Sequence, residues 1–140
     1  MFGKSKNTGR NSIHSATTLI ASGTKVQGNV HFKGFLEIEG EVEGNIFSED
    51  ADSRVRILNG GSVQGEVRVP LVIVNGHVQG DIFAEKQIEL ASKAVVEGNI
   101  HYQLIEIEKG AQVDGSFMHE VQPESSNVTS FPKEGAAEGS

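Results

Sequence analysis

The stretch Ile105-Glu-Ile-Glu-Lys-Gly-Ala-Gln-Val-Asp-Gly-Ser-Phe117 alternates apolar and polar residues, breaks at Gly110, and resumes as Val113-x-Gly115-x-Phe117. Its second half occurs six times along the chain. The six copies are Val26-Gln-Gly28-Asn-Val30, Val42-Glu-Gly44-Asn-Ile46, Val63-Gln-Gly65-Glu-Val67, Val78-Gln-Gly80-Asp-Ile82, Val96-Glu-Gly98-Asn-Ile100 and Val113-Asp-Gly115-Ser-Phe117. Successive glycines lie 16, 21, 15, 18 and 17 residues apart, and such self-similarity indicates an array of equivalent structural units.

Within each unit the apolar residues recur every second position, which is the period of a β-strand with one buried face. No window shows the apolar spacing of an amphipathic helix. Each unit is too short to bury its apolar face alone, so the units must stack on one another. The sequence therefore predicts an all-β, single-domain fold over residues 18–119, a parallel β-helix solenoid of about six rungs with about three short strands per turn.

Stacking places equivalent residues in columns that form the repeat core. One column contains the valines of the repeat, Val26, Val42, Val63, Val78, Val96 and Val113. The glycines that follow them, Gly28, Gly44, Gly65, Gly80, Gly98 and Gly115, have two interpretations. A small residue pointing inward is favoured because its parity matches the apolar set, and a positive φ or a bulge is the alternative.

The sequence on either side of the repeats differs in composition. Residues 1–17 contain three basic residues and no acidic one, and residues 120–140 contain two prolines and an excess of glutamate. Both segments hold too few apolar residues to offset the entropy of ordering, so we expect a disordered basic tail and a disordered acidic tail. Residues 48–53 account for the one long repeat and are expected to form a solvated acidic loop.

Composition excludes several classes of function. The chain has no cysteine and a net charge of −7, which gives no disulfide framework and argues against nucleic acid as a primary partner. The histidines do not form a column, so no metal site or cofactor is expected. A β-helical enzyme, an acyltransferase or a polysaccharide lyase, remains the alternative, although the irregular repeat lengths differ from the strict six-residue period of left-handed acyltransferases. We predict that the chain is not an enzyme.

The two ends of such a solenoid expose unpaired strand edges, and soluble solenoids cover these edges with a helix, prolines or charges. Neither end of the repeat region carries such a cap in the sequence. We therefore predict a homopolymer whose interface contains Leu19 and Ile20 in the first rung and Val113, Phe117 and Met118 in the last rung.

The six Val-x-Gly-x-(Val/Ile/Phe) units, the Ile-x-Ile-x-x-Gly segments before them and the polar flanks resemble the bactofilins, polymer-forming bacterial cytoskeletal proteins. The resemblance covers about residues 18–119. It implies a right-handed β-helix, end-to-end filaments without bound nucleotide, and a cytoplasmic scaffold that recruits cell-wall synthesis or hydrolysis proteins. The sequence is consistent with assembly without nucleotide, because Gly3-Lys4-Ser5 lacks the upstream glycine that a phosphate-binding loop requires.

The resemblance also extends to the opening Met1-Phe2-Gly3-Lys4-Ser5-Lys6, which matches the membrane-targeting segment of the family. Phe2 could bury its ring at the lipid interface while Lys4 and Lys6 meet anionic headgroups, each lysine contributing about 1 kcal/mol. A filament would display many such weak segments at once. The resemblance therefore implies a peripheral location at the inner face of the cytoplasmic membrane, with anionic lipid as a partner.

Overall fold

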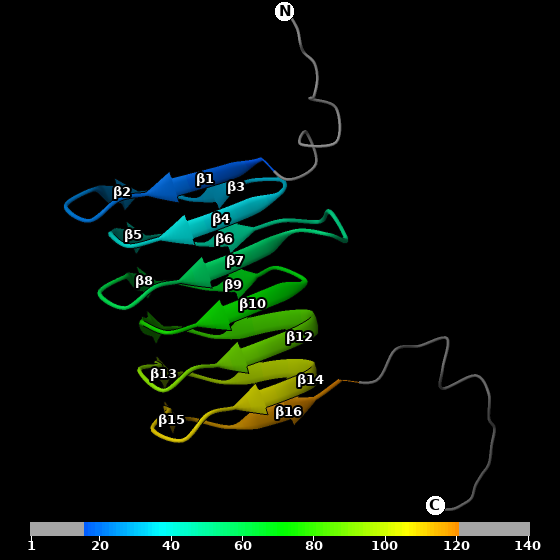
Figure 1. The fold of residues 1–140 in the computed structure, drawn as a ribbon. Helices are drawn as coiled ribbons and strands as arrows, with labels where there is room; N and C mark the ends of the chain where they lie inside the picture. The colour runs from blue at the N-terminus through cyan, green and yellow to red at the C-terminus, as the bar shows by residue number, and fades with distance from the viewer. Residues whose placement is uncertain (1–15, 121–140) are drawn as a thin grey trace, which may run out of the picture.

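The computed structural model describes residues 16–120 (Figure 1). These residues form sixteen strands, as the period-two alternation of apolar residues predicts. The described residues contain no helix that is long and apolar enough to cross a membrane. The strands are β1 (Thr17–Ile20), β2 (Lys25–Gln27), β3 (Val30–His31), β4 (Phe35–Ile38), β5 (Glu41–Glu43), β6 (Ile46–Phe47), β7 (Arg54–Ile57), β8 (Ser62–Gln64), β9 (Val67–Arg68), β10 (Leu71–Val74), β11 (His77–Gln79), β12 (Ile82–Leu90), β13 (Val95–Glu97), β14 (Ile100–Ile107), β15 (Gln112–Asp114) and β16 (Phe117–His119).

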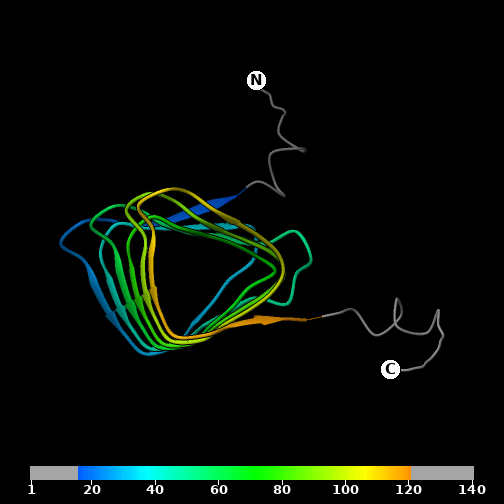
Figure 2. The same cartoon turned by 90° about the horizontal axis from the view of Figure 1, so that it is seen from below.

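The strands wind into six rungs around a triangular cross-section (Figure 2). Face 1 contains β1, β4, β7, β10 and the second halves of β12 and β14; face 2 contains β2, β5, β8, β11, β13 and β15. Face 3 contains β3, β6, β9, the first halves of β12 and β14, and β16. Every pairing is parallel and joins equivalent positions of successive rungs, as in Val42, Val63 and Val78.

The coil is right-handed. Viewed from the C-terminal end, the chain runs anticlockwise through faces 1, 2 and 3 as it approaches the viewer (Figures 1 and 2). The predicted all-β parallel solenoid of about six rungs is thus confirmed.

The core is the set of inward columns between the three faces. Val42, Val63, Val78 and Val96 are at most 1% exposed, whereas Val26 in the first rung is half-buried. Because successive rungs pair in register, each core side chain packs on the equivalent residue above and below it. Only the first and last rungs lack a neighbour on one side among the described residues.

The favoured interpretation of the repeat glycines is wrong. They lie at the corner between faces 2 and 3, are partly or fully exposed, and have φ between +132° and +159°. A Cβ on Gly80 would collide with the carbonyl oxygen of Gly65 in the rung before, and the same collision recurs at Gly44, Gly65, Gly98 and Gly115. The missing Cβ would therefore point along the rod into the preceding rung, not toward the core. The turn requires glycine for its backbone angle and for the close approach of the next rung.

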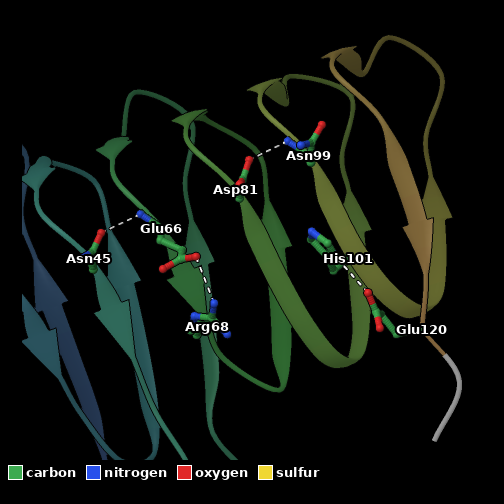
Figure 3. A network of polar contacts seen from close by, with 7 residues as sticks. All are labelled: Asn45, Glu66, Arg68, Asp81, Asn99, His101 and Glu120. Atoms are coloured by element: carbon green, nitrogen blue, oxygen red, sulfur yellow. Dashed lines mark hydrogen bonds and ion pairs between the residues drawn. The ribbon is translucent and has the colours of Figure 1, made fainter.

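A ladder of polar side chains follows these glycines (Figure 3). Asn45 Oδ1 accepts a hydrogen bond of 2.9 Å from the N–H of Glu66, and Asp81 Oδ1 accepts one of 2.9 Å from the N–H of Asn99. Asn29 and Asn99 act in the same way toward Asn45 and Ser116. The ladder satisfies backbone donors at a corner where the strands are interrupted.

The insertion at residues 48–53 projects from the rod between β6 and β7 (Figures 1 and 2). Glu49, Asp50 and Asp52 are exposed, as expected for a solvated acidic loop. The base of the loop is ordered, since Ser48 and Ser53 are buried and their Oγ atoms form a hydrogen bond of 2.5 Å. The Ser53 N–H also donates to the carbonyl oxygen of Asp50 at 2.9 Å.

Candidate assembly surfaces at the two ends of the rod

The C-terminal end of the rod exposes residues that belong to the core by position. Phe117 pairs with Ile100, and Ile107 pairs with Leu90. Ile100 and Leu90 are fully buried, but Phe117 is 45% exposed and Ile107 is 53% exposed. The side chains have the same inward orientation in both rungs, so the difference arises because no further rung covers the last one.

The remaining interface residues predicted at this end lie in different environments. Val113 is half-buried and pairs with Val96, so it lies in the inward column as expected. Met118 pairs with His101 on the outer side of face 3 and is 41% exposed. Its side chain therefore lies on the lateral surface, because neighbouring residues of a strand point to opposite sides.

An aromatic cluster occupies the face 3 side of the same end. The Tyr102 ring meets the edge of Phe117 with centroids 6.4 Å apart and lies 5.4 Å from the His119 ring. His119 Nε2 lies 3.1 Å from the carbonyl oxygen of Gln103. A second molecule that covered the last rung would contact this cluster as well as the aliphatic side chains.

At the N-terminal end, the two predicted residues point in opposite directions. Ile20 pairs with Ile38, lies in the inward column and is 8% exposed, whereas Leu19 pairs with Glu37, lies on the outer side of face 1 and is 53% exposed. The inward Val26 and Val30 are half-buried. Leu19, like Met118, therefore lies beside the end surface and not within it.

Near this end an ion pair joins the first two rungs on face 2. Lys25 Nζ lies 2.9 Å from Glu43 Oε2. The hydrogen bond to Glu43 raises the pKa of Lys25, and the same bond lowers the pKa of Glu43. Both groups are exposed, so solvent screens the pair and its contribution to stability is small.

Both ends also present unpaired strand edges within the described residues. In the first rung, β1, β2 and β3 each pair on one side only, and so do β15, β16 and the second half of β14 in the last rung. Such edges are templates for pairing with another chain. The two ends therefore combine unpaired backbone with exposed or half-exposed core positions.

Sequence reasoning missed part of this surface. Ile107 is as exposed as Leu19 and has the inward parity that Phe117 has, so the alternation could have identified it. Leu104, 63% exposed on the outer side of face 1, was also missed. The sequence also did not identify a partner for His101. In the structure its Nδ1 lies 2.8 Å from Oε2 of Glu120 in the next rung (Figure 3).

The remaining predicted sites are the membrane-targeting residues, the two tails and the expected absence of a metal site. Phe2, Lys4 and Lys6 lie outside the described residues, as do both predicted tails except at Ala16, Thr17 and Glu120. Between residues 16 and 120, no group of three or more His, Asp or Glu side chains is arranged to hold a metal ion.

These features define a class of protein: a parallel β-solenoid rod whose end rungs are open apolar edges. The chain matches the family model "Bactofilin: Polymer-forming cytoskeletal" over residues 18–118, and it belongs to the bactofilin family. It is 29% identical over 101 residues to bactofilin BacO of Myxococcus xanthus (strain DK1622), covering 72% of this chain and 78% of that relative. No solved structure matches the chain significantly.

Family membership makes this chain a polymer-forming cytoskeletal protein that associates with itself. This description is that of a structural protein and not of an enzyme, which disfavours the acyltransferase and lyase alternative. The solenoid explains how a polymer can be built, because its rungs are equivalent units that stack along one axis.

Proposed function

We propose that the chain polymerises end to end through its first and last rungs, without nucleotide, into filaments that lie on the inner face of the cytoplasmic membrane. The observation that carries the end-to-end joint is the exposure of core columns at the last rung, where Phe117 and Ile107 are about half exposed while their partners one rung inward are fully buried. Adding a rung from a second molecule would complete these columns.

The magnitudes indicate that the joint must use the whole end surface. Full burial of a large apolar side chain contributes about 1.5–3 kcal/mol, so covering the exposed halves of Phe117 and Ile107 contributes roughly 1.5–3 kcal/mol in total. Association costs about 4–15 kcal/mol in lost rigid-body freedom. The unpaired strand edges and the aromatic cluster around Tyr102 must therefore contribute to the joint.

The test of nucleotide independence uses purified full-length protein dialysed free of nucleotide and divalent cations. We expect electron microscopy to show filaments, with length unchanged when ATP, GTP or Mg²⁺ is added. A nucleotide requirement for assembly would refute this part of the proposal, and a monodisperse monomer at all protein concentrations would refute polymerisation itself.

The proposed membrane contact rests on Phe2, Lys4 and Lys6 at the basic N-terminal segment. Deletion of residues 2–6 should abolish co-sedimentation with anionic vesicles while filaments persist, and binding by the unmodified protein should weaken as salt rises. Vesicles of neutral lipid are the control. Equal co-sedimentation of the deletion variant would show that these residues are not the lipid contact.

The proposed role of the filament is to recruit cell-wall synthesis or hydrolysis proteins. A regular array of identical lateral surfaces would concentrate a partner along the membrane through avidity. Affinity purification of the tagged protein from its host should enrich such proteins with the unmodified, filament-forming protein and not with Phe117→Arg, which places a charge in the last rung. Equal recovery by both would show that polymerisation is not needed for recruitment.

A further inference from the structure

An open groove of about 860 Å³ runs under the 48–53 loop on face 3. Its volume falls in the range of about 300–1,000 Å³ that is usual for ligand clefts. Phe32 and Phe47 contribute aromatic surface, and the His31 ring packs on Phe47 with centroids 5.0 Å apart. The groove therefore offers an apolar contact surface on the side of the rod, extending from the first rung, which contributes Phe32, to the 48–53 loop.

Three carboxylates line this groove, and none has an ion-pair partner among residues 16–120. Glu49 and Asp50 come from the loop, and Glu85 comes from the turn within β12. The Ser48–Ser53 hydrogen bond fixes the base of the loop and so holds Glu49 and Asp50 over the groove. We call this set of residues (Phe32, Phe47, Glu49, Asp50 and Glu85) the loop groove.

The basic residues of the groove do not neutralise these carboxylates. Arg68 is paired with Glu66 at 3.1 Å (Figure 3), and its guanidinium lies 3.9 Å from the centre of the Phe83 ring. Lys33 forms no ion pair within the described residues. An occupant of complementary chemistry would combine an apolar side chain with several positive charges and no negative charge.

The N-terminal segment of this chain has this composition. Residues 1–15 contain Phe2, Lys4, Lys6 and Arg10 and no acidic residue. They join the rod beside the groove, because Ala16 accepts a 2.9 Å hydrogen bond from the N–H of Phe35, close to groove residue Lys33. At about 3.3–3.6 Å per residue, fifteen residues span roughly 50 Å, so length does not limit their reach.

We propose that residues 2–10 dock into the loop groove of their own chain, with Phe2 against Phe32 and Phe47 and with the basic side chains beside Glu49, Asp50 and Glu85. Docking within one chain is favoured by the high effective concentration of a short tether. A second copy of the rod is a poorer occupant, since residues 18–119 carry 15 acidic and 8 basic side chains and would repel the groove.

Docking in the loop groove competes with the membrane contact, an inference that rests on the proposed function. If Phe2, Lys4 and Lys6 contact lipid, the same side chains cannot occupy the loop groove at the same time. The groove then holds the segment back, and an anionic membrane must displace it. Anionic lipid and the loop groove are competitors for one segment.

The docking is tested without lipid by disulfide trapping in the full-length filament, since the chain has no cysteine. Ser5→Cys is combined with Ala51→Cys on the loop, which preserves every charge. The control combines Ser5→Cys with Gln64→Cys, an exposed position on face 2. We expect the loop pair to form a disulfide at least ten times faster than the control pair, and to migrate as a monomer in denaturing electrophoresis.

Two further variants separate the possible results. Glu49→Lys with Asp50→Lys should reduce the trapping rate at least tenfold, whereas Glu41→Lys with Glu89→Lys, in inner rungs on other faces, should not. Equal rates for the loop pair and the face 2 pair would overturn the docking, and a product of dimer mass would overturn docking within one chain.

Vesicle binding then tests the competition separately. If the segment contacts lipid, Glu49→Lys with Asp50→Lys should co-sediment with anionic vesicles several-fold more than the parent protein, relative to the same control variant. Trapping that succeeds with no change in vesicle binding would support the groove and refute the competition.

Discussion

Phe117 and Met118 are adjacent in the chain and similarly exposed, but only one of them belongs to the end surface. Phe117 continues the inward column above Ile100, and Met118 continues the outer stripe of face 3 above His101. The direction of a side chain at an end rung decides whether an added molecule covers it. This contrast supplies a matched pair of variants.

We predict that Phe117→Arg abolishes filaments and leaves the solenoid folded. An apolar joint can bury an unpaired charge only at a cost of several kcal/mol, whereas in the monomer the arginine reaches solvent from the open end. Met118→Arg adds the same charge on the lateral surface and should leave filaments intact. Circular dichroism and electron microscopy of the same samples measure both effects, and normal filaments from Phe117→Arg would place the joint elsewhere.

The repeat glycines support a second prediction at this scale. Gly80→Ala introduces a Cβ at a φ of +147° that collides with the carbonyl of Gly65, whereas Gly60→Ala introduces one at a φ of +96° with no atom within 4 Å. The strained backbone angle costs about 1–3 kcal/mol in each. Thermal denaturation should therefore show a larger loss of stability for Gly80→Ala, and equal losses would contradict the close approach of the two rungs.

These residues also show what the sequence could not predict. Parity places the repeat glycine inward only if the strand continues through it, but the chain turns a corner there and the alternation has no meaning at the turn. Leu19 and Met118 were assigned to the interface because they are apolar and near the ends, although their parity places them outward. Ile107 has the correct parity and was overlooked.

At the scale of the element, the rung was predictable because one period-two pattern recurs six times in nearly the same form. The inward valine column could be listed from the sequence, as could the insertion at 48–53. The polar ladder at the corner was not predictable in this way. The residue after the repeat glycine is Asn, Glu, Asp or Ser in different rungs. The function shared by Asn29, Asn45, Asp81 and Asn99, to accept a hydrogen bond from a backbone N–H of the next rung, depends on the register of stacking.

The ladder can be tested at one step. Asn45→Ala removes the acceptor of the Glu66 N–H and should destabilise the fold by about 0.5–1.5 kcal/mol. Asn45→Asp retains an acceptor oxygen, as Asp81 does at the equivalent corner, and should cost less. Hydrogen exchange should show the Glu66 amide exchanging faster in the alanine variant, and unchanged exchange there would mean that the bond does not protect this corner.

At the scale of the whole molecule, six equivalent rungs and two open ends make the protomer a segment of a rod that a polymer can extend. Each rung contacts only its neighbours, so the stability of the rod is approximately a sum of rung and interface terms. The joint, in contrast, depends only on the first and last rungs. The length of the protomer and the chemistry of its assembly are therefore separable properties.

This separation predicts the result of removing one rung. Deleting residues 66–80 joins Gly65 to Asp81 and brings Val55 and Ile57 against Ile88 and Leu90, which preserves the inward columns that β10 now connects. We expect a less stable protein that still forms filaments, with an axial repeat shortened by about 4.8 Å per protomer. Electron microscopy of the filament measures that repeat, and the same deletion carrying Phe117→Arg is the control that should not polymerise. Filaments with an unchanged repeat, or a folded deletion protein unable to assemble, would show that the joint involves more than the end rungs.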